Sequence, residues 1–120
     1  MLKQTFSNYK TQLENGELLQ VIENYYADDM VQVENNNAPI IGKAVLTEME
    51  IKSLAGVHSV EIKIPTWLVD EEQGLAMGEM VNSFDSKKMG KQVLIEAFLQ
   101  RWVGGKIVFQ KFYYNKVISQ

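Results

Sequence analysis

Much of the fold can be predicted outward from one stretch, YADDMVQVE, which spans residues 26–34. Its first residues continue the helical spacing of the apolar residues before it, so we expect a helix to end near Asp28 and Asp29. Residues 30–34 then predict a short strand. Glu34 lies at the tip of this strand, and the three asparagines that follow it predict a turn. The chain therefore carries one carboxylate where a strand ends.

Helices are predicted on both sides of this stretch. Apolar residues recur at helical spacing over residues 2–13, and Gly16 supplies a left-handed stop after them. A second apolar stripe covers residues 18–26 and ends in the stretch itself. Beyond the turn, residues 39–41 predict a short returning strand, and residues 42–56 predict a third helix.

The second half of the chain is predicted to form long strands. The four strands are expected at residues 57–70, 75–85, 92–103 and 106–115. Gly104-Gly105 between the last two is a two-residue hairpin turn. Helices that precede a meander of antiparallel strands indicate an α+β fold, with the helices packed on one face of a curved sheet. We expect one such domain over residues 1–120.

The last two of these strands are apolar on both faces. On the third strand one face carries Val93, Ile95, Ala97 and Leu99, and the other carries Leu94, Phe98 and Trp102. On the fourth, Ile107 and Phe109 are predicted to lie opposite Val108, Phe112 and Tyr114. A sheet with one solvated face would be polar on that face. We therefore expect one face to cover the helices or a cavity, and the other to bury against a second copy of the chain in a homodimer.

Composition narrows the possible partners. The formal net charge of −3 argues against nucleic acid, which needs a basic surface. The absence of cysteine excludes disulfides, thiolate catalysis and sulfur-ligated metals. No apolar run approaches the ~20 residues of a membrane helix, and the amino terminus is unlike a signal peptide. We expect a cytoplasmic protein without a membrane or nucleic-acid partner.

Several short motifs occur in a characteristic order. They are Leu13-Glu14-Asn15-Gly16-Glu17-Leu18, residues 26–34, Ile41-Gly42-Lys43, Gly105-Lys106-Ile107 and Phe112-Tyr113-Tyr114. In this order and spacing the chain resembles the nuclear-transport-factor-2-like superfamily, in its SnoaL-like and ketosteroid-isomerase-like branch. The resemblance covers nearly the whole chain. It implies a cone-shaped α+β barrel that encloses a pocket.

The resemblance also implies two catalytic candidates. Glu34 falls where the isomerases keep a proton-shuttling aspartate, and Tyr9 falls where they keep a tyrosine that donates to the substrate oxyanion. A carboxylate in an apolar cleft has a raised pKa, which suits a general base. A buried phenol is a neutral donor that can stabilise an enolate oxygen. The other interpretations are a solvated turn carboxylate for Glu34 and core packing for Tyr9.

Two positions depart from the pattern of the branch. The isomerases place a second, protonated acid where this chain has Phe98. The SnoaL-like cyclases place an acid after the closing aromatic pair, where this chain has Asn115. Neither side chain can supply a proton, so ketosteroid isomerase activity or polyketide cyclase activity itself is not expected.

The same strand register predicts which side chains line the pocket. These ligand-binding candidates are Tyr25, Tyr26, Glu96, Phe98, Gln110, Phe112 and Tyr114. Glu79 would lie beside Glu96 if the intervening hairpin closes symmetrically, whereas a shift of one residue would turn it to the opposite face. If two carboxylates share the pocket, one should hold its proton at neutral pH.

These residues point to a pocket for a small, largely apolar molecule. No cluster has the ligand count or spacing of a metal site, and we expect neither metal nor cofactor. Acid-base chemistry such as enolisation, isomerisation or dehydration is one hypothesis. The alternative is a non-catalytic ligand-binding or homodimerisation module. If aromatic side chains filled the cone completely, the ligand hypothesis would fail.

Overall fold

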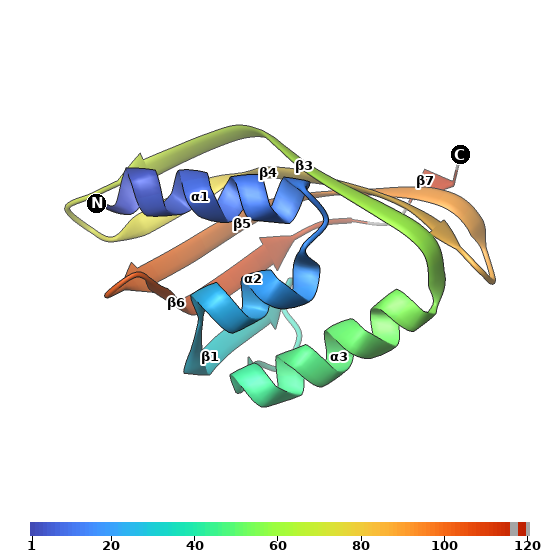
Figure 1. Ribbon diagram of the computed structural model, residues 1–120, viewed down its shortest axis with the longest axis horizontal. Coiled ribbons are helices and arrows are strands. Elements are labelled where there is room, and N and C mark those ends of the chain that lie inside the picture. Colours follow the sequence, from blue (N-terminus) through green and yellow to red (C-terminus); the bar gives the residue numbers. More distant parts are fainter. Residues whose placement is uncertain (116–117, 120) are drawn as a thin grey trace.

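Three helices pack on one side of a strongly curved sheet in the computed structural model, which describes residues 1–115 and 118–119 (Figure 1). The helices are α1 (Leu2–Glu14), α2 (Leu18–Tyr25) and α3 (Lys43–Ala55). The strands are β1 (Tyr26–Glu34), β2 (Ile40–Ile41), β3 (Val57–Asp70), β4 (Leu75–Ser86), β5 (Gly90–Val103), β6 (Lys106–Tyr113) and β7 (Ile118–Ser119). The predicted α+β class is confirmed. Within the described ranges, no helix is long and apolar enough to cross a membrane.

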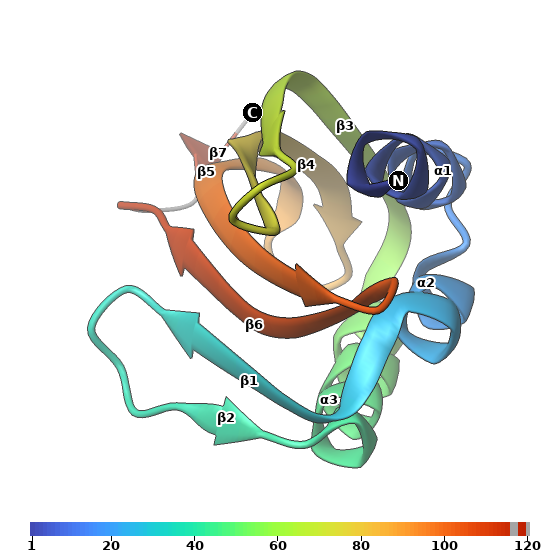
Figure 2. The same ribbon diagram turned by 90° about the vertical axis from the view of Figure 1, so that its left-hand side faces the viewer.

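The sheet curls so that its concave side faces the helices (Figure 2). Its strands follow the order β2-β1-β6-β5-β4-β3, and β7 pairs with β5. The β1–β6 pair is parallel, and the other pairs are antiparallel. Gly104 and Gly105 join β5 to β6 with φ angles of 57° and 79°, the left-handed conformation that a type I′ hairpin turn requires.

An aromatic cluster fills one end of the cone. Phe6 of α1 stacks on Phe98 of β5, with ring centroids 6.0 Å apart, and lies 5.0 Å from Trp67 of β3. Gly78 of β4 makes room for this packing. A Cβ there would lie 3.0 Å from the ring of Phe98 and against the carbonyl oxygen of Thr66. Phe98 is therefore a core residue.

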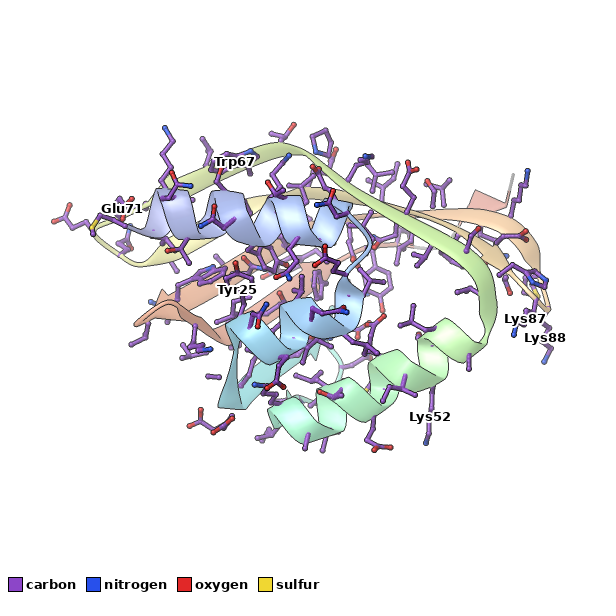
Figure 3. All side chains as sticks on the ribbon, viewed as in Figure 1. Tyr25, Lys52, Trp67, Glu71, Lys87 and Lys88 are labelled. Carbon is purple, nitrogen blue, oxygen red and sulfur yellow. The ribbon has the colours of Figure 1, made fainter. Side chains whose placement is uncertain are left out.

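The turn between β3 and β4 is joined to the start of α1. The carboxylate of Glu71 accepts hydrogen bonds from the amides of Leu2 and Lys3, both at 2.9 Å (Figure 3). These amides have no partner within the helix, and the positive end of the helix dipole favours a carboxylate there. The two hydrogen bonds hold the pKa of Glu71 below its usual value.

Strand β1 begins earlier than predicted. The helix α2 ends at Tyr25, because Tyr26 adopts an extended conformation with φ −85° and ψ 132°. Tyr26 already pairs with Ile107 of β6, and the register shifts before Val31 pairs with Phe109. The prediction that the helix ends near Asp28 and Asp29 was wrong, since both lie exposed in the strand.

A bulge in β6 reverses the predicted facing of Ile107. Arg101 pairs with Phe109 and Trp102 pairs with Ile107, so Val108 is an extra residue on this strand. An extra residue reverses the alternation of side chains beyond it. Ile107 is therefore fully buried on the inner face, opposite in facing to Phe109. The prediction that these two residues share a face was wrong.

Other strand ends differ by one or two residues. The strand β4 extends to Ser86, and β5 begins at Gly90, because the hairpin between them pairs up to these two residues. The strand β6 ends at Tyr113 rather than at residue 115. The short strand β7 was not predicted.

Candidate functional site

A cavity of about 250 Å³ lies between the helices and the concave side of the sheet. Its apolar lining includes Leu13, Leu18, Val21, Ile22, Leu46, Met49, Ile62, Met80, Leu94 and Phe112. Its polar lining consists of Tyr9, Tyr26, Gln32, Glu34, Glu50, Ser53, Asn82 and Glu96. Aromatic side chains thus do not fill the cone. The volume lies just below the ~300–1,000 Å³ usual for small-molecule sites, so it suits a small ligand.

Glu96 is the most deeply buried carboxylate of the cavity. It lies in the middle of β5, opposite Met80 of β4, and its side chain is only 8 % exposed. Asn82 donates to its Oε1 at 3.1 Å. Burial, with a smaller contribution from the charge of Glu34, raises the pKa of Glu96 to about 7, against the lowering effect of the Asn82 hydrogen bond. Glu96 can therefore hold its proton close to neutral pH.

Glu34 lies at the end of β1, as predicted, and is half-buried. The hydroxyl of Tyr114 donates to its Oε1 at 2.6 Å, and Gln32 donates to its Oε2 at 3.3 Å. The hydrogen bond to Glu34, followed by burial, raises the pKa of Tyr114 to about 12. Glu34 is therefore positioned by two neighbours and is not a free turn carboxylate.

A chain of three glutamine amides, of which Gln100 and Gln110 are fully buried, connects Glu34 to the aromatic cluster. The indole of Trp102 donates to Gln100 Oε1 at 3.1 Å, and Gln100 Nε2 donates to Gln110 Oε1 at 2.8 Å. Gln110 Nε2 then donates to Gln32 Oε1 at 2.9 Å, and Gln32 donates to Glu34. An indole can only donate and a carboxylate can only accept, so the two ends determine the orientation of all three amides.

Two tyrosines branch from this chain and line the cavity. The hydroxyl of Tyr9 accepts from Gln100 at 3.0 Å, and that of Tyr26 accepts from Gln110 at 3.1 Å. Each hydroxyl that accepts in this way still has its own proton to donate. Burial raises the pKa of Tyr26 to about 12 and that of Tyr9 still further above its usual value. Both phenols are neutral donors at the edge of the cavity.

The structure adds a third carboxylate that the sequence analysis missed. Glu50 of α3 lines the cavity, and burial raises its pKa. It follows the buried Leu46 by four residues, which places both on the same face of the helix. This spacing could have revealed it. Gln32 could have been found in the same way, because it precedes Glu34 by two residues on a strand.

The candidate ligand-binding residues divide into two groups. Glu96, Tyr26 and Phe112 line the cavity, as do the catalytic candidates Tyr9 and Glu34. The others lie behind this first layer. Tyr25 packs edge-on against Tyr9 and Trp102, Phe98 belongs to the core, Gln110 is fully buried in the amide chain, and Tyr114 contacts Glu34.

Glu79 lies on the opposite face of the sheet. It pairs with Ala97, one residue beyond the Met80–Glu96 pair, and is exposed. Of the two registers considered above, the structure has the one that turns Glu79 outward.

The ionisable side chains around the cavity are all acids or phenols. Three carboxylates line it, and the lining residues of the described chain include no lysine, arginine or histidine. In residues 1–115 and 118–119, no three histidine, cysteine, aspartate or glutamate side chains converge closely enough to hold a metal ion. The cavity is therefore acidic.

Comparison of the sequence with protein-family models and with curated proteins gives no match. The structure, however, is similar to solved structures. A protein from Mesorhizobium loti, described as a SnoaL-like polyketide cyclase, superposes with a TM-score of 0.79 at 21 % identity, over 95 % of this chain and 99 % of the other. An epoxide hydrolase of M. tuberculosis, described as LEH-like, gives 0.73 at 15 % identity, over 93 % and 76 %.

A third similar structure was determined with a bound small molecule. It is a protein of ketosteroid isomerase-like fold from Catenulispora acidiphila in complex with trimethylamine, with a TM-score of 0.74 at 16 % identity, over 92 % of this chain and 85 % of the other. At such identities the similarity shows the fold alone. The chain thus has the cone-shaped α+β fold of SnoaL-like and ketosteroid isomerase-like proteins, and the predicted resemblance is confirmed at that level.

Proposed function

We propose that the cavity binds a small, largely apolar molecule and performs acid-base chemistry on it with Glu34, Glu96 and Tyr9, without a cofactor. The observation that carries this proposal is the contrast between two carboxylates on one cavity. Glu96 is buried and holds its proton up to a pH of about 7, whereas Glu34 is a hydrogen-bond acceptor for Tyr114. A cavity with one proton donor and one acceptor can move a proton from one atom of a ligand to another.

The three side chains have distinct roles in this proposal. Glu34 takes a proton from a carbon beside a carbonyl group of the ligand. Tyr9 donates a hydrogen bond to the carbonyl oxygen as negative charge develops there, and it keeps its proton. Glu96 gives its proton to a second carbon of the resulting enolate, and Glu34 and Glu96 then exchange protons with water. The net reaction is an isomerisation that needs no redox partner.

The experiment that tests this function is a search for turnover among small enolisable ketones. The variant Glu34→Gln should abolish turnover and leave the fold intact. Glu79→Gln is the matched control, because Glu79 is exposed on the other face of the sheet and should leave turnover unchanged. Turnover that survives in Glu34→Gln would remove Glu34 from the mechanism.

A second candidate function is ligand binding without turnover. Phe98 favours it, because this residue is 2 % exposed in the core and cannot act as a second oxyanion donor. Exchange of ligand protons with deuterated water separates the two candidates. An enzyme of the proposed type exchanges the protons beside the carbonyl, whereas a binding module does not.

We also propose that two copies pair through the outer face of the sheet. Four side chains of this face are apolar and exposed: Leu68 (76 %), Met77 (51 %), Tyr113 (47 %) and Ile95 (46 %). The strands β3, β4, β5 and β6 contribute one residue each, so the apolar surface crosses four neighbouring strands. The same face of a second copy of the chain would cover this apolar surface and remove it from water.

A further inference from the structure

The proposed reaction assigns no role to Glu50. This carboxylate projects from α3 into the cavity, on the side opposite the sheet that carries Glu96. Burial raises its pKa, and no hydrogen bond or ion pair to another described side chain accompanies it. Glu50 is half-buried, and a partly buried carboxylate without a counterion inside the protein is a candidate for one supplied by a ligand.

The charge around Glu50 supports this interpretation. The cavity contains three carboxylates and, among its lining residues, no basic side chain. Lys52, two residues further along α3, is exposed and points away from the sheet (Figure 3). The carboxylates repel one another, and no basic side chain at the cavity reduces this repulsion. A positively charged group bound in the cavity would reduce it.

A second, independent observation comes from Glu96. Its side chain is more than nine-tenths buried, and Asn82 bonds only its Oε1. The other oxygen has no hydrogen-bond partner among the described residues, although Glu96 lines the cavity. Since no fully buried side-chain oxygen of the described residues lacks a partner, this oxygen is open to the cavity, where a bound molecule can donate a hydrogen bond to it.

The remaining lining selects the type of cation. The rings of Tyr26 and Phe112 and the side chains of Met49 and Leu46 present carbon surfaces to the cavity. A small hard metal ion prefers to be surrounded by oxygen atoms. An organic ammonium, in contrast, gains from aromatic faces and buries its own carbon atoms against aliphatic ones.

We propose that the ligand of the cavity is a small amine, in which an ammonium group binds Glu50 and an apolar body fills the remaining space. This inference rests on the proposed function, because it identifies the class of molecule that the proposed site binds. Within that function, the ammonium group positions the ligand and leaves Glu34, Glu96 and Tyr9 to the proton transfer.

The test compares two probes of nearly equal size, cyclohexylammonium and cyclohexanol. Amide shifts in NMR spectra of the labelled protein report the affinity for each probe and whether the shifts lie around the cavity. We expect cyclohexylammonium to bind the wild-type protein at least about tenfold more tightly than cyclohexanol, which corresponds to ~1.4 kcal/mol. In Glu50→Gln this preference should disappear, while cyclohexanol still binds. Glu48→Gln, an exposed neighbour on α3, is the matched control and should retain it.

Each result decides between the two proposals. If cyclohexanol binds as tightly as cyclohexylammonium, or if Glu50→Gln keeps the preference, the inference is wrong and the proposed small-molecule function stands. If neither probe shifts residues around the cavity, both proposals are wrong. The same spectra show whether Glu50→Gln folds. If it does not, Ser53→Lys places a cation one turn from Glu50, and it must also abolish the preference.

Discussion

Gln100 donates to Gln110 across the β5–β6 pair, with an Nε2–Oε1 distance of 2.8 Å, and both side chains are wholly buried. This bond joins the two halves of the amide chain that runs from the indole of Trp102 to the carboxylate of Glu34. Because every donor in the chain points toward Glu34, the network holds Tyr9 and Tyr26 with their own protons available to the cavity.

The first prediction concerns the stability that this network contributes. Gln100→Leu leaves the Trp102 indole and Gln110 without their buried partner, and each unsatisfied group costs about 1–3 kcal/mol. We expect the free energy of unfolding in urea to fall by about 2–5 kcal/mol. Gln20→Leu on the exposed side of α2 should change it by less than ~0.5 kcal/mol. An equally small effect at Gln100 would contradict a cooperative network.

The second prediction follows from the raised pKa of Glu96. A group with a pKa of 4.5 in the unfolded chain and about 7 in the folded protein binds more protons when folded. Its contribution to stability is complete below pH 4.5 and is lost as the pH rises through 7. Between pH 5 and pH 8, the free energy of unfolding of the wild type should therefore fall by about 2.5 kcal/mol relative to Glu96→Gln. Parallel pH profiles for the two proteins would contradict burial of an ionisable Glu96.

The third prediction concerns the donor of the proposed reaction. In Tyr9→Phe the ring remains in the core, but the hydroxyl proton that faces the cavity is lost. Removal of one donor to a developing oxyanion lowers kcat by roughly 10²–10³-fold. We expect this loss in kcat with a much smaller change in KM. A change confined to KM would instead make Tyr9 a binding residue.

The fourth prediction concerns the outer face of the sheet. Sedimentation equilibrium of the wild-type protein should give the mass of a dimer, twice 13.7 kDa. Met77→Lys puts a charge in the centre of the exposed apolar surface and should give a monomer, because an unpaired buried charge opposes association. Leu19→Lys, at an exposed position of α2, should leave the dimer intact. A wild-type protein that sediments as a monomer would refute the proposed pairing.

Helices and turns with strong local signals could be predicted from the sequence. The helix α1 ends near Gly16, and α3 begins after Gly42, both of which have positive φ angles that favour glycine. The Gly104-Gly105 turn likewise depends on its own two residues. These features need no knowledge of the rest of the molecule, and they were predicted at their observed positions.

Features that depend on pairing between distant strands could not be predicted in the same way. The early start of β1 at Tyr26 and the bulge at Val108 both arise where β1, β5 and β6 adjust their registers to one another. The bulge directs Ile107 inward, into the hydrophobic core that also contains Trp102. Nothing local to Val108 marks it as the extra residue.

Part of the candidate site could be predicted, because side chains alternate between the two faces of each strand. Glu96 and Phe112 line the cavity, as the alternation along their strands predicted, and so does Glu34, which the family resemblance placed there. The amide chain joins glutamines on three strands, so its existence depends on the register of all three. Glu50 could have been predicted from its helical spacing after Leu46. Its importance, however, depends on the absence of basic residues from the cavity lining, which is seen only in the folded structure.

A carboxyl-carbon NMR titration of Glu96, with the resonance assigned through Glu96→Gln, tests directly whether the cavity holds a proton donor at neutral pH. We expect a midpoint near pH 7 in the wild type. In Glu34→Gln the midpoint should be lower, because the charge of Glu34 contributes to the raised pKa of Glu96. A wild-type midpoint near the ordinary value of 4.5 would mean that Glu96 is solvated, and it would contradict a cavity with a proton donor at neutral pH.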